Sequence, residues 1–473
     1  MKVLFASSEA YPFAMSGGLA DVAGALPKAL RKRFVGCRVV MPLYGNITQE
    51  MRDKMTFICN ITVPVAWRRQ YCGVFEAHLD GVIYYFIDNQ YYFNREGLYG
   101  HYDDAERFAF FSRAVLEIIP YINFTPDIIH CNDWQTALIP VYLDAFYKYA
   151  DLYKDMKTVF TIHNIQYQGK YGYELTEEVL GLPPENASLV DYDNCVNFMK
   201  GAIQCADKVT TVSPTYSKEI LDPYYSHGLD GILKLFTYKL TGIVNGIDVD
   251  VYNPETDSLI YKNYSLKLLS GKDVNKKKLQ EELGLPQKAD VPVIGIVTRL
   301  VKHKGIDLVK CVFEELLRAD AQFAILGSGE WEFETFFNDM AKKYPDKVGL
   351  VLGFKPQLAH RIYAGADMFL MPSQSEPCGL AQMVALRYGT IPIVRETGGL
   401  NDTISDSGDG EGNGFTFKSY NAHDMQNTVW RALAGYADKD GWKMLKERAM
   451  KCDNSWGTSA TAYIKLYKEI LGQ

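Results

Sequence analysis

Two cations at one predicted turn are well placed to bind a diphosphate. Arg299 and Lys304 follow an aliphatic run that ends at Val297, and a glycine comes directly after the lysine. Cations at a strand-to-helix turn can stabilise the charge that develops on a departing phosphate group. A single basic turn is usually only a solvated loop, so this interpretation depends on what the neighbouring loops carry.

Two further loops of the second half place small and polar residues after predicted strands. Residues 373–380 read Ser-Gln-Ser-Glu-Pro-Cys-Gly-Leu, with a carboxylate at Glu376, and residues 395–400 read Arg-Glu-Thr-Gly-Gly-Leu. In open α/β sheets, ligands bind beyond the carboxyl ends of the strands. Three such loops together favour a binding site for a sugar nucleotide far more than one loop would.

A pair of glycines follows the first predicted strand. Gly17 and Gly18 stand directly before a helical pattern, so backbone N–H groups could approach an anion at the start of that helix. The spacing differs from the Gly-x-Gly-x-x-Gly dinucleotide fingerprint and gives no support to hydride transfer. Taken alone, glycines before a helix most often have only a structural role.

The elements that must position these loops form two series of alternating strands and helices. This alternation predicts parallel sheets with right-handed crossovers that cover both faces. We therefore expect an α/β protein with two doubly wound halves that join near residues 240–250. The predicted strands are 2–6, 38–40, 82–87, 128–130, 158–162 and 209–212 in the first half and 294–297, 323–326, 348–352, 368–371 and 391–394 in the second, where helices are expected over 307–317, 331–341, 358–364 and 381–387.

Composition narrows the functional class. The chain has 473 residues, 47% of them hydrophobic and 23% charged, which favours two or three globular domains. A net charge of −7 argues against a general nucleic-acid binder. Nine scattered cysteines without a Cys-x-x-Cys pair fit neither a disulfide framework nor a zinc site. The apolar runs are too short for a signal peptide or a membrane span, so we expect a cytoplasmic protein that does not bind membranes.

Several motifs carry a family resemblance: Ser-Gly-Gly-Leu at 16–19, His-Asn-Ile-Gln-Tyr-Gln-Gly at 163–169, Gly-Leu-Asp-Gly at 228–231, Val-Asn-Gly-Ile-Asp at 244–248, Glu-Pro-Cys-Gly-Leu at 376–380, Gly-Thr-Ile-Pro-Ile-Val-Arg at 389–395 and Thr-Gly-Gly-Leu at 397–400. Together they resemble the family of bacterial glycogen synthases and plant starch synthases. The resemblance implies a GT-B fold, in which two Rossmann-like domains face each other across a cleft. It also implies transfer of glucose from ADP-glucose to the non-reducing end of an α-1,4-glucan, with retention at the anomeric carbon.

The resemblance and the strand pattern together predict how the chain is divided. We expect an N-terminal Rossmann-like acceptor and catalytic domain over residues 1–242 and a nucleotide-sugar-binding domain over 243–455. A final helix within 456–473 is expected to return to the first domain.

Site residues are assigned by the resemblance, position by position. Arg299 and Lys304 would bind the diphosphate, and Glu376 would hold sugar hydroxyls. Asp133 would face the reacting centre, and His163 and Asn245 would contact the glucosyl unit. The other substrate-binding candidates are Met15, Gly17, Gly18, Asp21, Phe354 (which would stack on the adenine), Cys378, Gly379, Leu380, Thr397, Gly398 and Gly399.

Three of these residues also have plain structural interpretations. Asp133 precedes a predicted helix and could be its N-cap. His163 follows an apolar strand and could be a satisfied buried histidine. Glu376, before a proline, could be a turn residue. We favour a functional role for all three because several independent motifs agree.

Position 15 departs from the family pattern. Members usually carry Lys-Thr-Gly-Gly-Leu where this chain has Met-Ser-Gly-Gly-Leu, so Met15 replaces a lysine that would face the donor phosphates. Loss of one charge-assisted contact could cost about 1.5–3 kcal/mol of donor binding. Another cation could compensate, donor affinity could be lower, or donor preference could have changed.

Two alternatives to the implied activity stay open at this stage. The same fold could use UDP-glucose or another acceptor, or the chain could be a glucan-binding protein with weak catalysis. No metal or cofactor is expected, because two bare Asp-x-Asp matches are too common to indicate a metal site. The expected partners are a nucleotide sugar and an α-glucan, and the sequence does not indicate an oligomeric state.

Overall fold

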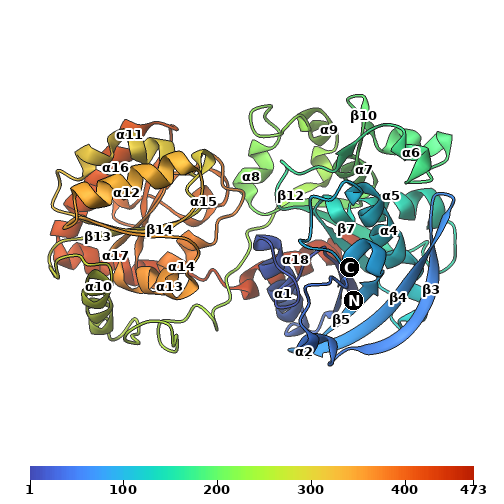
Figure 1. Ribbon diagram of the computed structural model, residues 1–473, viewed down its shortest axis with the longest axis horizontal. Helices are drawn as coiled ribbons and strands as arrows, with labels where there is room; N and C mark the ends of the chain where they lie inside the picture. Colours follow the sequence, from blue (N-terminus) through green and yellow to red (C-terminus); the bar gives the residue numbers. More distant parts are fainter. The chain divides into compact units, whose positions relative to one another are not determined.

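The computed structural model describes residues 1–408 and 410–473, which fold into two compact units (Figure 1). The first unit comprises Met1–Ile243 together with Trp456–Gln473, and the second comprises Val244–Ser455. The chain therefore leaves the first unit once and returns to it for its last helix. Each unit has its own central sheet.

A nine-stranded sheet forms the centre of the first unit, in the order β12-β11-β7-β6-β1-β2-β5-β4-β3. All pairs from β12 to β5 are parallel. Val3, Leu4 and Phe5 are fully buried, as expected for a central strand that helices cover on both faces. The strands are β1 (Lys2–Ala6), β2 (Gly36–Pro42), β3 (Thr56–Val65), β4 (Arg68–Leu79), β5 (Val82–Asp88), β6 (Ile128–Asn132), β7 (Lys157–Ile162), β11 (Lys208–Thr211) and β12 (Leu240–Gly242).

A long antiparallel hairpin at one edge of this sheet departs from the predicted topology (Figure 1). β4 pairs antiparallel with both β3 and β5, and neither β3 nor β4 is among the predicted strands, which all pair in parallel with one another in this half. Ala66, with φ 51°, and Trp67 connect β3 to β4 without the Asn-Gly or Asp-Gly pair that usually marks such a turn. A small antiparallel sheet of β8 (Lys170–Tyr171), β10 (Cys195–Asn197) and β9 (Asp191–Tyr192) was also not predicted.

The last helix, α18 (Trp456–Ile470), packs on α1 (Gly18–Arg31) in the first unit (Figure 1). Its Tyr467 hydroxyl lies 2.6 Å from Nδ1 of the fully buried His130 on β6, whose Nε2 lies 2.6 Å from Thr161 Oγ1 on β7. Burial lowers the pKa of His130 to about 3, so the ring is neutral. The other helices of this unit are α2 (Gln49–Arg52), α3 (Gln90–Phe93), α4 (Asp104–Glu117), α5 (Leu138–Tyr142), α6 (Leu175–Glu178), α7 (Phe198–Cys205), α8 (Pro214–Glu219) and α9 (Asp230–Leu235).

The second unit is built on a six-stranded, fully parallel sheet in the order β15-β14-β13-β16-β17-β18. The predicted strands and helices of this half lie within two residues of the observed bounds. The strands are β13 (Val293–Val297), β14 (Gln322–Gly327), β15 (Val348–Leu352), β16 (Met368–Met371), β17 (Ile391–Arg395) and β18 (Phe415–Phe417). The helices are α10 (Ser270–Glu282), α11 (Ile306–Leu316), α12 (Trp331–Lys343), α13 (Pro356–Gly365), α14 (Ala381–Arg387), α15 (Gly398–Thr403), α16 (Ala422–Ala437) and α17 (Lys439–Lys451).

A continuous apolar core lies between the sheet of the second unit and its helices, with Ile296, Phe313 and Phe323 among its members. This packing fixes the carboxyl ends of the strands, from which the predicted loops emerge. Among the helices that the structure describes, none is both long and apolar enough to cross a membrane.

Candidate functional site

The three predicted loops of the second unit lie together at its topological switch point. The connections of the sheet reverse direction between β13 and β16. The loops that follow β13, β16 and the adjacent β17 therefore share one edge, which is where ligands bind in open α/β sheets. They carry Arg299 with Lys304, then Glu376, and then Gly398 with Gly399.

A buried carboxylate joins the first two loops. Glu376 is only 7% exposed, and its two oxygens lie 2.9 and 2.7 Å from Lys304 Nζ. Ser373 Oγ donates to Oε2 of the same carboxylate at 2.9 Å. A buried and paired carboxylate is not a plain turn residue, so that alternative for Glu376 was wrong. The Lys304 side chain remains partly exposed, so its ammonium group can also meet a ligand.

One of the four basic side chains in the first loop, His303, is neutral at pH 7. Arg299 is exposed, and its guanidinium group lies 3.4 Å from Nε2 of His303. Burial, and then the charges of Lys304 and Arg299, lower the pKa of His303 below its ordinary value. The histidine is therefore neutral, and Arg299, Lys302 and Lys304 supply the cationic character of this loop.

The glycines of the third loop have a packing role that the sequence did not reveal. A Cβ atom on Gly398 would lie 2.0 Å from the carbonyl oxygen of Glu376, and one on Gly399 would lie 2.0 Å from that of Cys378. Gly399 N–H donates to the Glu376 carbonyl at 3.1 Å. The second and third loops thus touch through their backbones, and glycine is required for that approach.

Asn245 and Cys378 lie beside this junction and are both buried. The backbone N–H of Asn245 is bonded to the Cys378 sulfur, and burial raises the pKa of this thiol to about 12, so it is not a thiolate. The Asn245 Oδ1 atom is buried and has no hydrogen-bond partner within the described part of the chain. An orphaned acceptor of this kind suits a ligand hydroxyl or amine.

The other predicted residues of this unit surround the same loops. Phe354 is 86% exposed in the segment after β15, and an exposed ring is available for stacking on a base. Gly379, with φ 70°, and Leu380 lie directly before α14. Thr397 is fully buried and precedes α15.

In the first unit, Asp133 follows β6 in a strained backbone conformation with φ 56°. Its Oδ1 atom accepts the N–H groups of His163 at 2.7 Å and of Asn164 at 3.4 Å. Asp133 occupies the N-cap position of the short helical turn that follows, but its side chain makes no capping bond there, so capping does not account for this carboxylate. Burial raises the pKa of Asp133 to about 7, against the lowering effect of the two N–H groups.

His163 follows β7 and is half-buried. Asn132 donates from Nδ2 to the carbonyls of Ala6 and His130, which turns its Oδ1 atom toward His163 Nε2 at 2.9 Å. Nε2 therefore carries the proton, and Nδ1 is an acceptor without a partner among the residues described. Burial lowers the pKa of His163 to about 3, so the ring is neutral and only half-satisfied.

The glycine loop after β1 is held by Glu9, a residue that the sequence interpretation missed. The Glu9 carboxylate accepts Ser16 N–H at 2.5 Å and Gly17 N–H at 3.2 Å, so these donors are occupied from within the chain. A Cβ atom on Gly17 or Gly18 would meet nothing within 4 Å. Neither glycine is required by packing, and the space in front of the loop is open.

Met15 and Asp21 flank this loop. Met15 is 53% exposed, and Glu9 forms no ion pair with any residue that the structure describes. The family pattern places a lysine at position 15. In this chain, no described cation of the first unit pairs with Glu9 in place of that lysine. Partial burial, and then the charge of Glu9, raise the pKa of Asp21.

The missed residues could have been found by one rule. Glu9 follows β1 in Ser-Ser-Glu, Asn132 ends β6, and Ser373 follows β16. Each lies at the carboxyl end of a parallel strand, where ligands bind. None of these three residues lies within the motifs that carry the family resemblance, so the resemblance did not assign them a role.

Both halves of the chain match known family models. Residues 2–235 match the model described as the starch synthase catalytic domain, and residues 276–449 match glycosyl transferases group 1. Glycogen synthase of Geobacillus thermodenitrificans is 54% identical over 475 residues, covering 100% of this chain and 98% of that protein. Glycogen synthase of Bacillus cereus is 53% identical, covering 100% of both.

Solved structures show the same similarity. The catalytic domain of starch synthase IV from Arabidopsis thaliana, bound to ADP and acarbose, superposes with a TM-score of 0.90 at 35% identity, covering 100% of this chain and 99% of that one. Sucrose-phosphate synthase from Thermosynechococcus elongatus superposes with a TM-score of 0.61 at 17% identity, with the same coverage. This second likeness concerns the fold alone.

Proposed function

The chain belongs to the family of glycogen and starch synthases, and from that premise we propose that it transfers glucose from ADP-glucose to the non-reducing end of an α-1,4-glucan with retention of configuration. The observation that carries the proposal is the cluster at the switch point of the second unit. Arg299 and Lys304 supply two positive charges, and Glu376 fixes one of them in place. The catalytic domain of starch synthase IV described above was solved with ADP and acarbose bound.

In this proposal, Arg299 and Lys304 stabilise the negative charge that grows on ADP as the glycosidic bond breaks. The acceptor hydroxyl attacks from the face that the nucleotide leaves, and the departing phosphate accepts its proton. Glu376 orients Lys304 and contacts the sugar, and Phe354 stacks on the adenine. Catalysis then depends on positioning and on charge stabilisation more than on a strong base.

The residues of the first unit have a matching role. We assign neutral His163 to the glucosyl unit, because its unpartnered Nδ1 can accept a sugar hydroxyl. Asp133 is assigned to the reacting centre, where a carboxyl group with a pKa of about 7 can exist in either protonation state. No metal has a role in this scheme, since the two cations bind the diphosphate, and activity is expected to survive excess EDTA.

The test is initial-rate measurement of ADP release with glycogen and either ADP-glucose or UDP-glucose. We expect turnover of ADP-glucose and a loss of about 100-fold or more in kcat/KM for Lys304→Met. Lys302→Met is the matched control, because this neighbouring lysine is exposed and its ammonium group has no partner among the described residues. Faster turnover of UDP-glucose would contradict the donor assignment. Glycogen binding without ADP release would contradict catalysis.

A further inference from the structure

Glu9 is a buried carboxylate that, among the residues the structure describes, is held in place by hydrogen bonds and by no ion pair. It is 4% exposed and accepts Ser16 N–H at 2.5 Å, Ser16 Oγ–H at 3.1 Å, Gly17 N–H at 3.2 Å and Tyr99 O–H at 3.1 Å. Three of these donors belong to the glycine loop, so the carboxylate acts as an internal anion for that loop. A carboxylate with several such donors binds them strongly, because each bond is charge-assisted.

These bonds determine which backbone donors of the loop stay available. Ser16 and Gly17 direct their N–H groups at Glu9, whereas Gly18 opens α1 with open space in front of it. Glu9 therefore fixes the conformation of the loop and, with it, the orientation of the Gly18 N–H group at the start of α1. A loop without this carboxylate would have to order itself when the donor binds, which lowers affinity.

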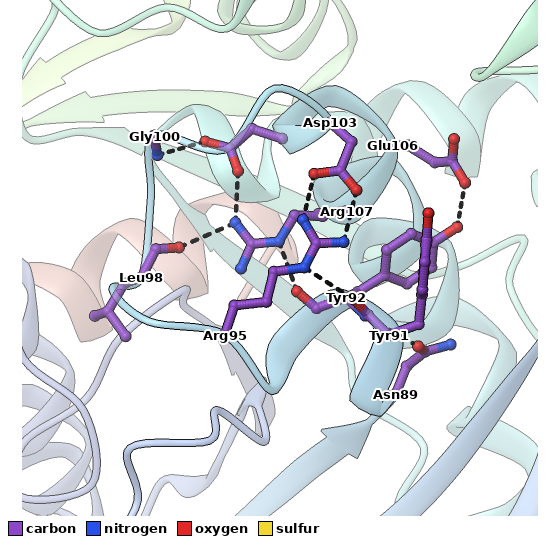
Figure 2. Close-up of polar contacts among 10 residues, drawn as sticks. Asn89, Tyr91, Tyr92, Arg95, Leu98, Gly100, Asp103, Glu106 and Arg107 are labelled. Atoms are coloured by element: carbon purple, nitrogen blue, oxygen red, sulfur yellow. Dashed lines mark hydrogen bonds and ion pairs between the residues drawn. The ribbon is translucent and has the colours of Figure 1, made fainter.

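The fourth donor is the Tyr99 hydroxyl, which lies in a segment whose backbone is fixed by a different set of hydrogen bonds. Tyr99 O–H lies 2.7 Å from Ser8 Oγ as well as 3.1 Å from Glu9, so its position determines the geometry at the carboxylate. The tyrosine lies between Leu98 and Gly100, and both of these neighbours are held through their backbones (Figure 2).

Arg107 on α4 is the centre of this anchorage (Figure 2). Its guanidinium group is fully buried and donates to the Leu98 carbonyl at 3.2 Å, the Tyr92 carbonyl at 2.7 Å and Asp104 Oδ1 at 2.5 Å. The other oxygen of Asp104 accepts Gly100 N–H at 2.8 Å. The segment that carries Tyr99 is thus clamped on both sides by one buried ion pair.

We propose that Glu9 is a positioning residue for the nucleotide-sugar donor, which holds the glycine loop in its binding conformation and is itself oriented by Tyr99 from the segment that Arg107 clamps. The proposal rests on the proposed function, because it takes ADP-glucose as the donor. It adds a residue that acts through the loop and not by contact with the reacting atoms.

The experiment is a double-mutant cycle on wild type, Glu9→Gln, Tyr99→Phe and the double variant, with Tyr92→Phe as the matched control. Tyr92 also donates to a glutamate, Glu106, in the same cluster, but that bond does not lead to the glycine loop (Figure 2). The readouts are KM for ADP-glucose, KM for glycogen, kcat, and ADP binding by calorimetry.

We expect Glu9→Gln to raise KM for ADP-glucose and Kd for ADP about tenfold. Tyr99→Phe should raise them several-fold, and the double variant should resemble Glu9→Gln alone because both changes act on one path. KM for glycogen and the properties of Tyr92→Phe should stay at wild-type values. Additive effects, equal effects on the two KM values, or a Tyr92→Phe defect that matches Tyr99→Phe would overturn the proposal.

The experiment distinguishes failure of the proposed function from failure of the role of Glu9. If wild type does not turn over ADP-glucose, the proposed function fails. If wild type is active and the variants bind ADP normally, only the role of Glu9 fails. Should Glu9→Gln not fold, Tyr99→Phe against Tyr92→Phe still decides, because each change removes a single hydroxyl and leaves the ring in place.

Discussion

The substitution Gly18→Ala tests whether Gly18 is required for binding the donor or for the stability of the fold. Gly18 is the first residue of α1, its φ lies outside the left-handed region, and an added Cβ would meet nothing within 4 Å. Alanine should therefore fit, and because it restricts the unfolded chain, it should stabilise the protein by about 0.4–1 kcal/mol. The same methyl group would occupy the space in front of the loop, where the donor phosphate is proposed to bind.

The expected cost falls on donor binding. Displacing a phosphate oxygen from the Gly18 N–H group removes a charge-assisted hydrogen bond, at about 1.5–3 kcal/mol. KM for ADP-glucose should rise about 10- to 150-fold, while KM for glycogen and the thermal unfolding midpoint stay level or improve. ADP-release kinetics and thermal unfolding of the same preparation measure both effects.

The matched control is Gly399→Ala. Its Cβ atom would lie 2.0 Å from the carbonyl oxygen of Cys378, so this variant should unfold at a lower temperature. A lower unfolding midpoint for Gly18→Ala would show that this glycine has a structural role after all. An unchanged KM for ADP-glucose would show that the loop does not meet the donor.

Three further predictions concern single side chains. Met15→Lys should lower KM for ADP-glucose about tenfold or more, because it restores a cation near the phosphates; no change in KM would mean that the loop lies away from them. Asp133→Asn should abolish an inflection near pH 7 in the profile of kcat/KM. Since burial raises the folded pKa of Asp133 above its unfolded value, the native state loses stability as pH rises toward and through 7. The variant should therefore gain stability relative to wild type as the pH rises from about 4 to about 7, and a constant difference over that range would refute the shift. Phe354→Ala should raise KM for ADP-glucose without changing thermal unfolding, because the ring is 86% exposed. Trp430→Ala, which removes another exposed aromatic of the second unit, is its control.

The second unit was predictable because its signals are local. Each strand is a short aliphatic run bounded by turn residues, as in 348–352 and 368–371, whose bounds the structure reproduces. The fold class and the family were confirmed for the same reason, since several motifs follow such strands directly.

The first unit was harder because its missed features depend on distant residues. β3 has exposed and half-buried positions over most of its length, so it lacks the continuous apolar run that reveals a buried strand. Glu9 gains its role from Ser16, Gly17 and Tyr99, and the last of these lies 90 positions away in the chain. Likewise, Gly398 and Gly399 are required by carbonyl oxygens of another loop, which no local pattern encodes.

The return of α18 to the first unit makes the second unit an insertion within the first, and this ordering constrains folding during synthesis. Residues 244–455 contain the whole sheet of the second unit in one continuous stretch, whose ends meet at the bond from Ile247 N–H to the Asn454 carbonyl. The first unit, although translated earlier, lacks the partner of a buried histidine until Tyr467 emerges. The unit whose synthesis begins first is therefore completed last, and a chain that ended before α18 would lack the Tyr467 hydroxyl that partners the buried His130.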